Sequence, residues 1–264
     1  AVSRNVRNSY KCITTKEELK KLIKDATKAE TVAIDTETTG LDYIDSELVG
    51  ISLSFKAGEG FYIPIGHKDD STPQLAIDYV LAELKPLLES NDKKFIGQNI
   101  KFDKNVLSKY GVDISSIKND TMMMSYVLDA SATRHNLDAL ASFYLGYKTS
   151  TFEEVAGKGV KQVTFDQVPI EAATNYAAED ADITLRLYDE LSPQLESIDS
   201  LNKLNEEIEI PLIEVLSNME RNGAILNAKI LNAQSKDLES RIKKLEKKAY
   251  KIAGEEFNLG STKQ

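Results

Sequence analysis

The first hundred residues alternate between helical and strand-like patterns of apolar positions. A capping box over residues 15–18 opens an amphipathic helix. Apolar runs typical of strands follow at 32–37, 48–55 and 60–65, and the short segment 56–59 joins the last two as a hairpin. This order predicts an antiparallel portion of a sheet.

Helical spacing dominates the next hundred residues. The expected helices lie at 73–90, 98–111, 120–130, 136–145 and 169–191, and one short strand lies at 95–97. Ser192-Pro193 is expected to interrupt the last helix. Residues 149–164 contain two glycines and are expected to form an irregular surface loop. An early sheet followed by helices indicates an α/β or α+β domain over residues 1–200.

Residues 201–264 follow a different pattern, with little core of their own. One apolar stripe predicts a helix that starts near Ile208 and ends at Gly223. A second, longer helix is expected between Asn227 and Gly254, and its apolar residues recur at heptad-like spacing. Because a short turn joins the two helices, we expect an antiparallel helical hairpin.

The composition excludes several kinds of site. Of the 264 residues, 41% are hydrophobic and 28% charged, and no apolar run is long enough to span a bilayer. The single cysteine, Cys12, excludes an internal disulfide and a thiolate zinc cluster, and two histidines are too few for an imidazole-rich metal site. We therefore expect a cytoplasmic protein with no membrane partner.

The charge is unevenly distributed along the chain. The net charge of −9 by itself argues against a nucleic-acid partner. However, residues 229–251 hold eight basic and three acidic side chains, a net charge of +5, which leaves −14 for the remainder. Part of this acidity can belong to a metal site, where bound cations would neutralise it.

Two carboxylates stand at the end of the first predicted strand after the opening helix. Asp35 and Glu37 are two residues apart, so both side chains point to the same face of the strand. Two like charges this close favour a divalent cation with hard oxygen ligands, such as Mg²⁺ or Mn²⁺. On this segment alone, capping of the following turn explains the two acids equally well.

Two further pairs of polar residues recur at helical spacing. Asn99 and Asp103 are four residues apart at a strand-to-helix junction, and Tyr176 and Asp180 are four apart within the helix 169–191. Each pair can share one helix face. Alanines next to Asp180 would let its helix approach another surface closely. Each pair alone is common, and only the combination is specific.

The combination resembles the three exonuclease motifs of the DEDD 3′–5′ exonuclease superfamily, in the subclass whose third motif carries tyrosine. The matching residues are Asp35, Glu37, Asp103, Tyr176 and Asp180. Longer segments, at 97–99, 151–159 and 176–182, look like the proofreading domain of the bacterial DNA polymerase I family. Residues 220–223 and 254–264 resemble the start of the polymerase thumb in that family.

This resemblance implies a ribonuclease H-like fold, a mixed sheet with flanking helices, and a site for two divalent metal ions, Mg²⁺ or Mn²⁺. Such ions clamp the attacking and leaving oxygens of a phosphoryl displacement. By resemblance, Asp35 bridges both ions, Glu37 and Asp180 complete the ion that activates water, and Asp103 holds the second ion. Tyr176 would orient the water, because a tyrosine pKa of ~10 makes it a poor base near neutrality.

The resemblance also implies residues that contact the DNA strand. Leu41 and Phe152 would pack against the terminal base, a contact that does not depend on base sequence. Further contacts to the strand are expected from Gln98, Asn99, Lys101 and Arg134. Without the family resemblance, a core position would be the preferred interpretation of Leu41 and Phe152.

The predicted function is metal-dependent removal of nucleotides from single-stranded or frayed DNA 3′ ends, with release of nucleoside 5′-monophosphates. The polymerase domain of the parent chain would be the partner, and no polymerase active site is expected within these residues. Two alternatives are a catalytically silent structural module and an RNase D-like exoribonuclease. The acids do not separate DNA from RNA, and the thumb-like tail favours DNA.

Overall fold

The computed structural model describes residues 8–69 and 71–263, which fall into two compact units that divide between Arg221 and Asn222. The first unit contains the sheet and most of the helices. The second unit consists of one long helix and the segments beside it.

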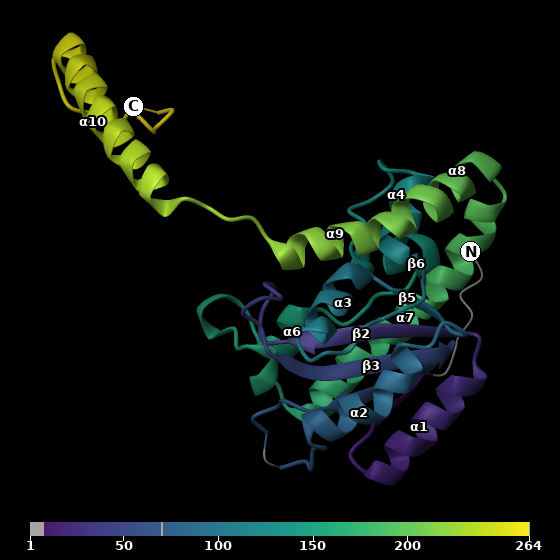
Figure 1. The fold of residues 1–264 in the computed structure, drawn as a ribbon. Coiled ribbons are helices and arrows are strands. Elements are labelled where there is room, and N and C mark those ends of the chain that lie inside the picture. The colour runs from purple at the N-terminus through teal and green to yellow at the C-terminus, as the bar shows by residue number, and fades with distance from the viewer. Residues whose placement is uncertain (1–7, 70, 264) are drawn as a thin grey trace. The chain divides into compact units, whose positions relative to one another are not determined.

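A six-stranded mixed sheet forms the centre of the first unit, in the order β1-β4-β3-β2-β5-β6 (Figure 1). β3 pairs antiparallel with both β2 and β4, which confirms the predicted antiparallel portion. The β1–β4, β2–β5 and β5–β6 pairings are parallel. The strands are β1 Ser9–Cys12, β2 Thr31–Thr38, β3 Leu48–Lys56, β4 Glu59–Pro64, β5 Lys94–Gly97 and β6 Ile117–Asp120. The sequence pattern did not reveal β1 and β6, because their sequences, SYKC and IKND, lack the apolar run that marks the equally short β5.

The flanking helices include the predicted ones in their expected order. They are α1 Lys16–Lys28, α2 Ile77–Leu88, α3 Ile100–Ser108, α4 Thr121–Leu128, α5 Leu137–Leu140, α6 Phe152–Ala156, α7 Ile170–Glu196, α8 Asp199–Leu204 and α9 Ile210–Asn222. The sequence pattern did not predict α6 and α8. Short helical turns fill the remainder at η1 Ala141–Leu145, η2 Gly159–Lys161, η3 Phe165–Gln167 and η4 Asn205–Glu209. The fold is therefore α/β, as predicted, and is consistent with a ribonuclease H-like exonuclease.

Helices cover both faces of the sheet, and β2 contributes to both layers (Figure 1). Val32 and Ile34 join the hydrophobic cluster that contains buried residues of α1, α2 and α3. Ala33, which points the other way, packs with Leu185 of α7. The odd-numbered residues of β2, Asp35 and Glu37 among them, therefore face the side of the sheet that α7 covers.

Two local predictions were wrong. The helix expected to end at Ser192-Pro193 continues to Glu196, because Leu187, Leu191 and Leu195 bury one apolar stripe across the proline. Proline removes one backbone hydrogen bond but does not end a helix whose packing continues. The loop expected over 149–164 contains α6, which a capping box between Thr151 and Glu154 begins.

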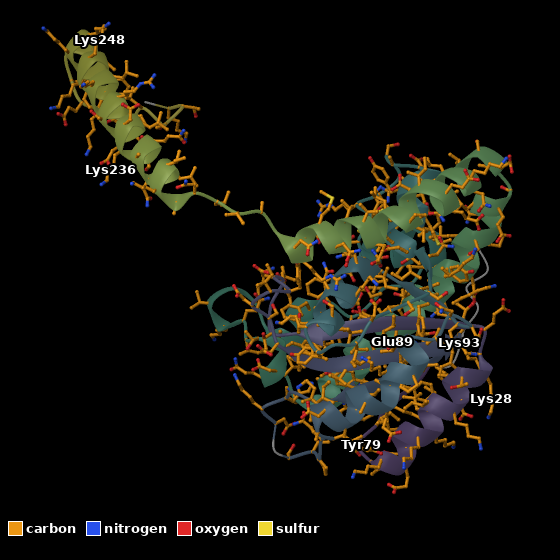
Figure 2. The ribbon with its side chains drawn as sticks, viewed as in Figure 1. Lys28, Tyr79, Glu89, Lys93, Lys236 and Lys248 are labelled. Carbon is orange, nitrogen blue, oxygen red and sulfur yellow. The ribbon has the colours of Figure 1, made fainter. Side chains whose placement is uncertain are left out.

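The second unit contains α10 Ala228–Ala253, which begins at the predicted cap Asn227 and ends at Gly254 in the left-handed conformation. Figure 2 shows Lys236 and Lys248 projecting from this helix. α9 belongs to the first unit, where its Ile213 and Ser217 are buried. The antiparallel pairing of these two helices and the domain boundary at residue 200 stay predictions.

None of the helices in the described part of the chain combines the length and the apolar character that a membrane crossing requires.

Candidate functional site

β2 supplies the first two acids of the candidate site. Asp35 lies opposite Ser52 of β3 and Glu37 lies opposite Gly50, so neighbouring strands fix the position of both. Strand alternation directs both carboxylates to one face, as the sequence predicted, and α7 covers that face. Thr36, between them, points to the other face and is buried.

α7 supplies the third acid, Asp180, from above the same face. The helix lies unusually close to the sheet, because Ala177, Ala178 and Ala181 are fully buried and Gly60 of β4 has no side chain. A Cβ atom added to Gly60 would lie 2.2 Å from the Ala178 carbonyl oxygen. Small residues on both elements therefore allow Asp180 to reach the carboxylates of β2.

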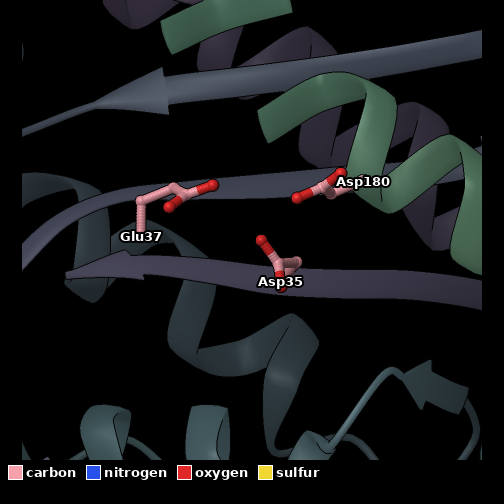
Figure 3. Close-up of side chains that lie close together, drawn as sticks. All are labelled: Asp35, Glu37 and Asp180. Carbon is pink, nitrogen blue, oxygen red and sulfur yellow. The ribbon is translucent and has the colours of Figure 1, made fainter. Parts of the chain in front are cut away.

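Asp35, Glu37 and Asp180 converge into one cluster (Figure 3). One carboxylate oxygen from each lies within 4.8 Å of the other two. Among the described residues, none of the three forms an ion pair with a lysine or arginine. Three acids without a basic partner fit a divalent cation with oxygen ligands better than a capping role.

The electrostatics of the cluster support this interpretation. Burial raises the pKa of Asp35 to about 7, although the Ser52 hydroxyl opposes the shift. Burial, followed by the charge of Asp35, raises the pKa of both Glu37 and Asp180 well above the ordinary values. The ionised cluster is unfavourable by itself, so a cation held among these oxygens would relieve both desolvation and repulsion.

Asp103 stands apart from this cluster. It lies on α3, is 2% exposed, and its Oδ1 atom accepts hydrogen bonds from the backbone nitrogen and the hydroxyl of Thr36, at 2.8 and 2.6 Å. Burial, followed by the charge of Asp35, raises the pKa of Asp103. The sequence predicted that all four acids form one site. The structure brings one carboxylate oxygen from each of three of them within 4.8 Å of the others. Metal binding by Asp103 stays a prediction.

Tyr176 lies one helical turn before Asp180 on α7, as the spacing required. Its ring packs against Phe165 and Phe152, with centroids 5.8 and 6.4 Å away. Burial, followed by the charge of Asp180, raises the pKa of its hydroxyl. The phenol therefore stays protonated near neutrality and can act as a hydrogen-bond donor.

Two predicted contacts to the terminal base lie outside the hydrophobic core. Phe152, at the start of α6, is 38% exposed beside Tyr176. Leu41, just after β2, is 96% exposed. Neither residue is in the core, so the interpretation that the sequence alone favoured is wrong for both, and their contact with DNA stays a prediction.

The other four predicted contacts to DNA are in different environments. The Gln98 amide nitrogen donates to the His135 carbonyl, and its oxygen accepts from the Thr121 hydroxyl. Asn99 precedes α3 in the left-handed conformation, with φ 65°. Lys101 forms an ion pair with Glu220 of α9. Arg134 is exposed, and the binding of DNA by all four stays a prediction.

Two further acids of α7 close to Asp180 are buried and have specific partners that the sequence pattern did not predict. Asp182 is fully buried and accepts from the Tyr10 hydroxyl and the Gly58 nitrogen. Glu179 is 6% exposed and accepts from the Tyr147 hydroxyl and the Ser150 nitrogen. Both side chains connect α7 to surrounding segments, and the helical spacing from Asp182 to Arg186 was the visible signal for one of them.

Acids from a strand and a helix converge on one face of a mixed sheet beside a tyrosine, an arrangement that fits a metal-dependent nuclease. Comparison of the sequence with known families gives the same result: the 3′–5′ exonuclease family matches residues 10–196. The chain belongs to this 3′–5′ exonuclease family of DNA polymerase I enzymes. The family uses divalent metal ions, and the acidic cluster supplies suitable ligands.

A curated relative supports the assignment, and solved structures support the fold. DNA polymerase I of Pseudomonas aeruginosa is 49% identical over 245 residues, which are 92% of this chain and 27% of the relative. The structure of the POL domain of Pol1 from M. smegmatis in complex with DNA primer-template and dNTP covers 96% of this chain and 39% of that chain, with a TM-score of 0.71 and 22% identity. NrnC of Brucella melitensis covers 75% of this chain and 88% of that chain, with a TM-score of 0.60 and 25% identity. The chain thus spans about a quarter of the length of its curated polymerase relatives.

Proposed function

We propose that this chain is the proofreading module of a DNA polymerase I. It removes nucleotides from single-stranded or frayed DNA 3′ ends and releases nucleoside 5′-monophosphates. The single observation that carries the proposal is the convergence of Asp35, Glu37 and Asp180 within 4.8 Å of one another. A cluster of like charges with raised pKa values is typical of a functional site.

The proposed cofactors are two divalent cations, Mg²⁺ or Mn²⁺. Asp35, Glu37 and Asp180 would hold one of them, and Asp103 together with Asp35 the other. When bound, such ions supply electrostatic stabilisation of the attacking and leaving oxygens of the phosphodiester. The chemistry of the donor set fits, because every proposed ligand atom is a carboxylate oxygen.

The remaining side chains position the substrate and the attacking water. The protonated Tyr176 hydroxyl orients the water through a hydrogen bond but does not take its proton, because burial raises its pKa. Phe152 and Leu41 expose apolar surface that can pack against the terminal base. Such contacts favour an unpaired end, because a paired base already stacks within its duplex.

The proposed partners and location follow from the relatives. Residues 201–264 would begin the polymerase region of a longer chain, with α10 as part of its thumb, and the whole protein would act in the cytoplasm. A 3′ end that leaves the polymerase site would be the substrate. A matched DNA and RNA pair of oligonucleotides tests whether deoxyribose is preferred over ribose.

The experiment is a gel assay with a single-stranded oligonucleotide labelled at its 5′ end, incubated with Mg²⁺ or Mn²⁺. We expect a ladder of products that shorten from the 3′ end, and no products with a chelator. Asp35→Ala is expected to stop cleavage, whereas Asp45→Ala, which changes an exposed acid outside the cluster, retains it. A chain that folds but leaves the oligonucleotide intact under all conditions would support the silent structural module instead.

A further inference from the structure

Asp103 is held by one residue in an unusual way. Both hydrogen bonds that the described residues donate to its carboxylate come from Thr36, and both end on the same atom, Oδ1. A carboxylate oxygen has two lone pairs available for hydrogen bonding, so Thr36 occupies Oδ1 fully. Oδ2 receives no hydrogen bond from the described part of the chain and stays available for another ligand.

Thr36 is free to make these bonds because of the sheet register. The parallel pairing of β2 with β5 ends at Ala33, opposite Ile96. Beyond this point no strand of the described residues pairs with β2 on that edge, and the Thr36 nitrogen donates to Asp103 instead. Because the Thr36 side chain points away from Asp35 and Glu37, its hydroxyl reaches the side of the sheet on which α3 packs.

The helix that carries Asp103 is itself fixed at its start. The buried Asp120 carboxylate accepts hydrogen bonds from the Asn99 and Ile100 nitrogens, at 3.1 and 2.8 Å. These bonds hold the left-handed residue Asn99 and the first turn of α3. The backbone of α3 is therefore held in place where Asp103 faces β2, and the hydrogen bonds from Thr36 orient the Asp103 carboxylate.

We propose that Thr36 is a positioning residue that makes Asp103 a one-oxygen ligand for the second cation. With Oδ1 occupied, Asp103 offers only Oδ2, and it stays outside the cluster formed by Asp35, Glu37 and Asp180. Magnesium and manganese prefer single-oxygen carboxylate ligands in regular octahedral geometry. This inference rests on the proposed two-cation function, and it makes a residue that binds no metal responsible for the oxygen that Asp103 offers to the second cation.

The test uses two substitutions of similar size. Thr36→Val keeps the branched shape and the backbone bond but removes the hydroxyl, and Thr36→Ser keeps the hydroxyl. Calorimetric titration of the metal-free protein with Mn²⁺ measures both cation positions. We expect Thr36→Val to weaken Mn²⁺ binding at the lower-affinity position by about 10-fold and to leave the affinity of the other position within about 2-fold of the parent. Substitution of a residue that hydrogen-bonds to a metal ligand typically changes metal affinity by about this factor. Thr36→Ser is expected to stay close to the parent.

A second readout is the Mn²⁺ dependence of cleavage. Thr36→Val is expected to need about 10-fold more Mn²⁺ for half-maximal cleavage and to approach the parent rate at saturation. Unchanged Mn²⁺ affinities would overturn the inference, and so would an equal loss at both positions with a lowered melting temperature. The proposed function fails separately, if Asp35→Ala cleaves DNA like the parent.

Discussion

Asp182, two residues after Asp180, accepts a hydrogen bond from the Gly58 backbone nitrogen at 2.6 Å. Gly58 lies in the turn between β3 and β4, so this bond fastens α7 to the sheet near the point where Asp180 enters the site. The Tyr10 hydroxyl donates to the other oxygen at 3.1 Å, and Arg186 lies 3.7 Å away. A buried acid outside the cluster thus helps to place Asp180, one of the proposed cation ligands.

Asp182→Ala is expected to lower the free energy of unfolding by about 2–4 kcal/mol, because buried donors lose their acceptor and Arg186 loses its ion pair. Tyr10→Phe removes only one donor and is expected to cost about 1 kcal/mol. Urea unfolding of both variants measures the difference. A loss below that of Tyr10→Phe would show that the acid does not fasten the helix.

Gly60→Ala tests the close approach of α7 to the sheet. The added methyl group would lie 2.2 Å from the Ala178 carbonyl oxygen, so the helix backbone must move. We expect a loss of about 1–3 kcal/mol in stability, and weaker Mn²⁺ binding because Asp180 moves with the helix. Thermal unfolding and calorimetry check the two effects, and parent-like values in both would mean that the helix adapts without displacing Asp180.

The periodicities in the sequence were sufficient to predict which side chains share a face. The two-residue spacing of Asp35 and Glu37 and the four-residue spacing of Tyr176 and Asp180 both hold in the structure. The distance between the two pairs could not be predicted from sequence, because it depends on the contact between Gly60 and Ala178. Contacts between segments distant in sequence leave no periodic signal.

The contacts of Asp103 could not be predicted from the sequence for the same reason. The sequence correctly placed it on a helix after a strand, although Asn99, expected to share its helix face, precedes the helix in the left-handed conformation. Its bond to Thr36 joins residues 67 positions apart and depends on where the β5 pairing stops. Pro193 illustrates the opposite error, because a local rule predicted a break that the burial of Leu191 and Leu195 overrides.

The stability of the metal-free protein is expected to fall as the pH rises. The pKa of Asp35 is about 7 in the folded protein, against ~3.9 for an unfolded aspartate. The folded state therefore binds the proton more tightly, so the stabilisation is complete below about pH 4 and is lost as the pH rises through 7. Glu37 and Asp180 shift in the same direction.

Asp35→Asn removes this dependence in part and tests its origin. At pH 8 without metal, the variant is expected to be more stable than the parent by on the order of 2 kcal/mol, and at pH 5 the difference narrows. Urea unfolding in the presence of a chelator measures the difference in stability between variant and parent at each pH. Added Mn²⁺ is expected to stabilise the parent more than the variant. A parent that is equally stable at both pH values would contradict the raised pKa.

Tyr176→Phe separates the hydroxyl from the ring. The ring contacts with Phe152 and Phe165 remain, so melting temperature and Mn²⁺ affinity are expected to match the parent. Cleavage is expected to slow by about 10–100-fold through kcat, because the attacking water loses its hydrogen-bond partner. Single-turnover cleavage with saturating Mn²⁺ is the measurement, and a parent-like rate would exclude a role for the hydroxyl.

Glu220→Gln tests whether Lys101 contacts DNA. In the structure Lys101 pairs with Glu220, which also accepts from the Asn105 amide at 3.1 Å. A phosphate would compete with Glu220 for this lysine, so removal of the acid is expected to tighten single-stranded DNA binding by about 2–5-fold at low salt and by less at high salt. Glu196→Gln, which removes an exposed acid at the end of α7, controls for net charge. Fluorescence anisotropy measures the affinities. The gain is expected to vanish in the Lys101→Ala background, and a gain that persists there would assign the effect to general electrostatics rather than to Lys101.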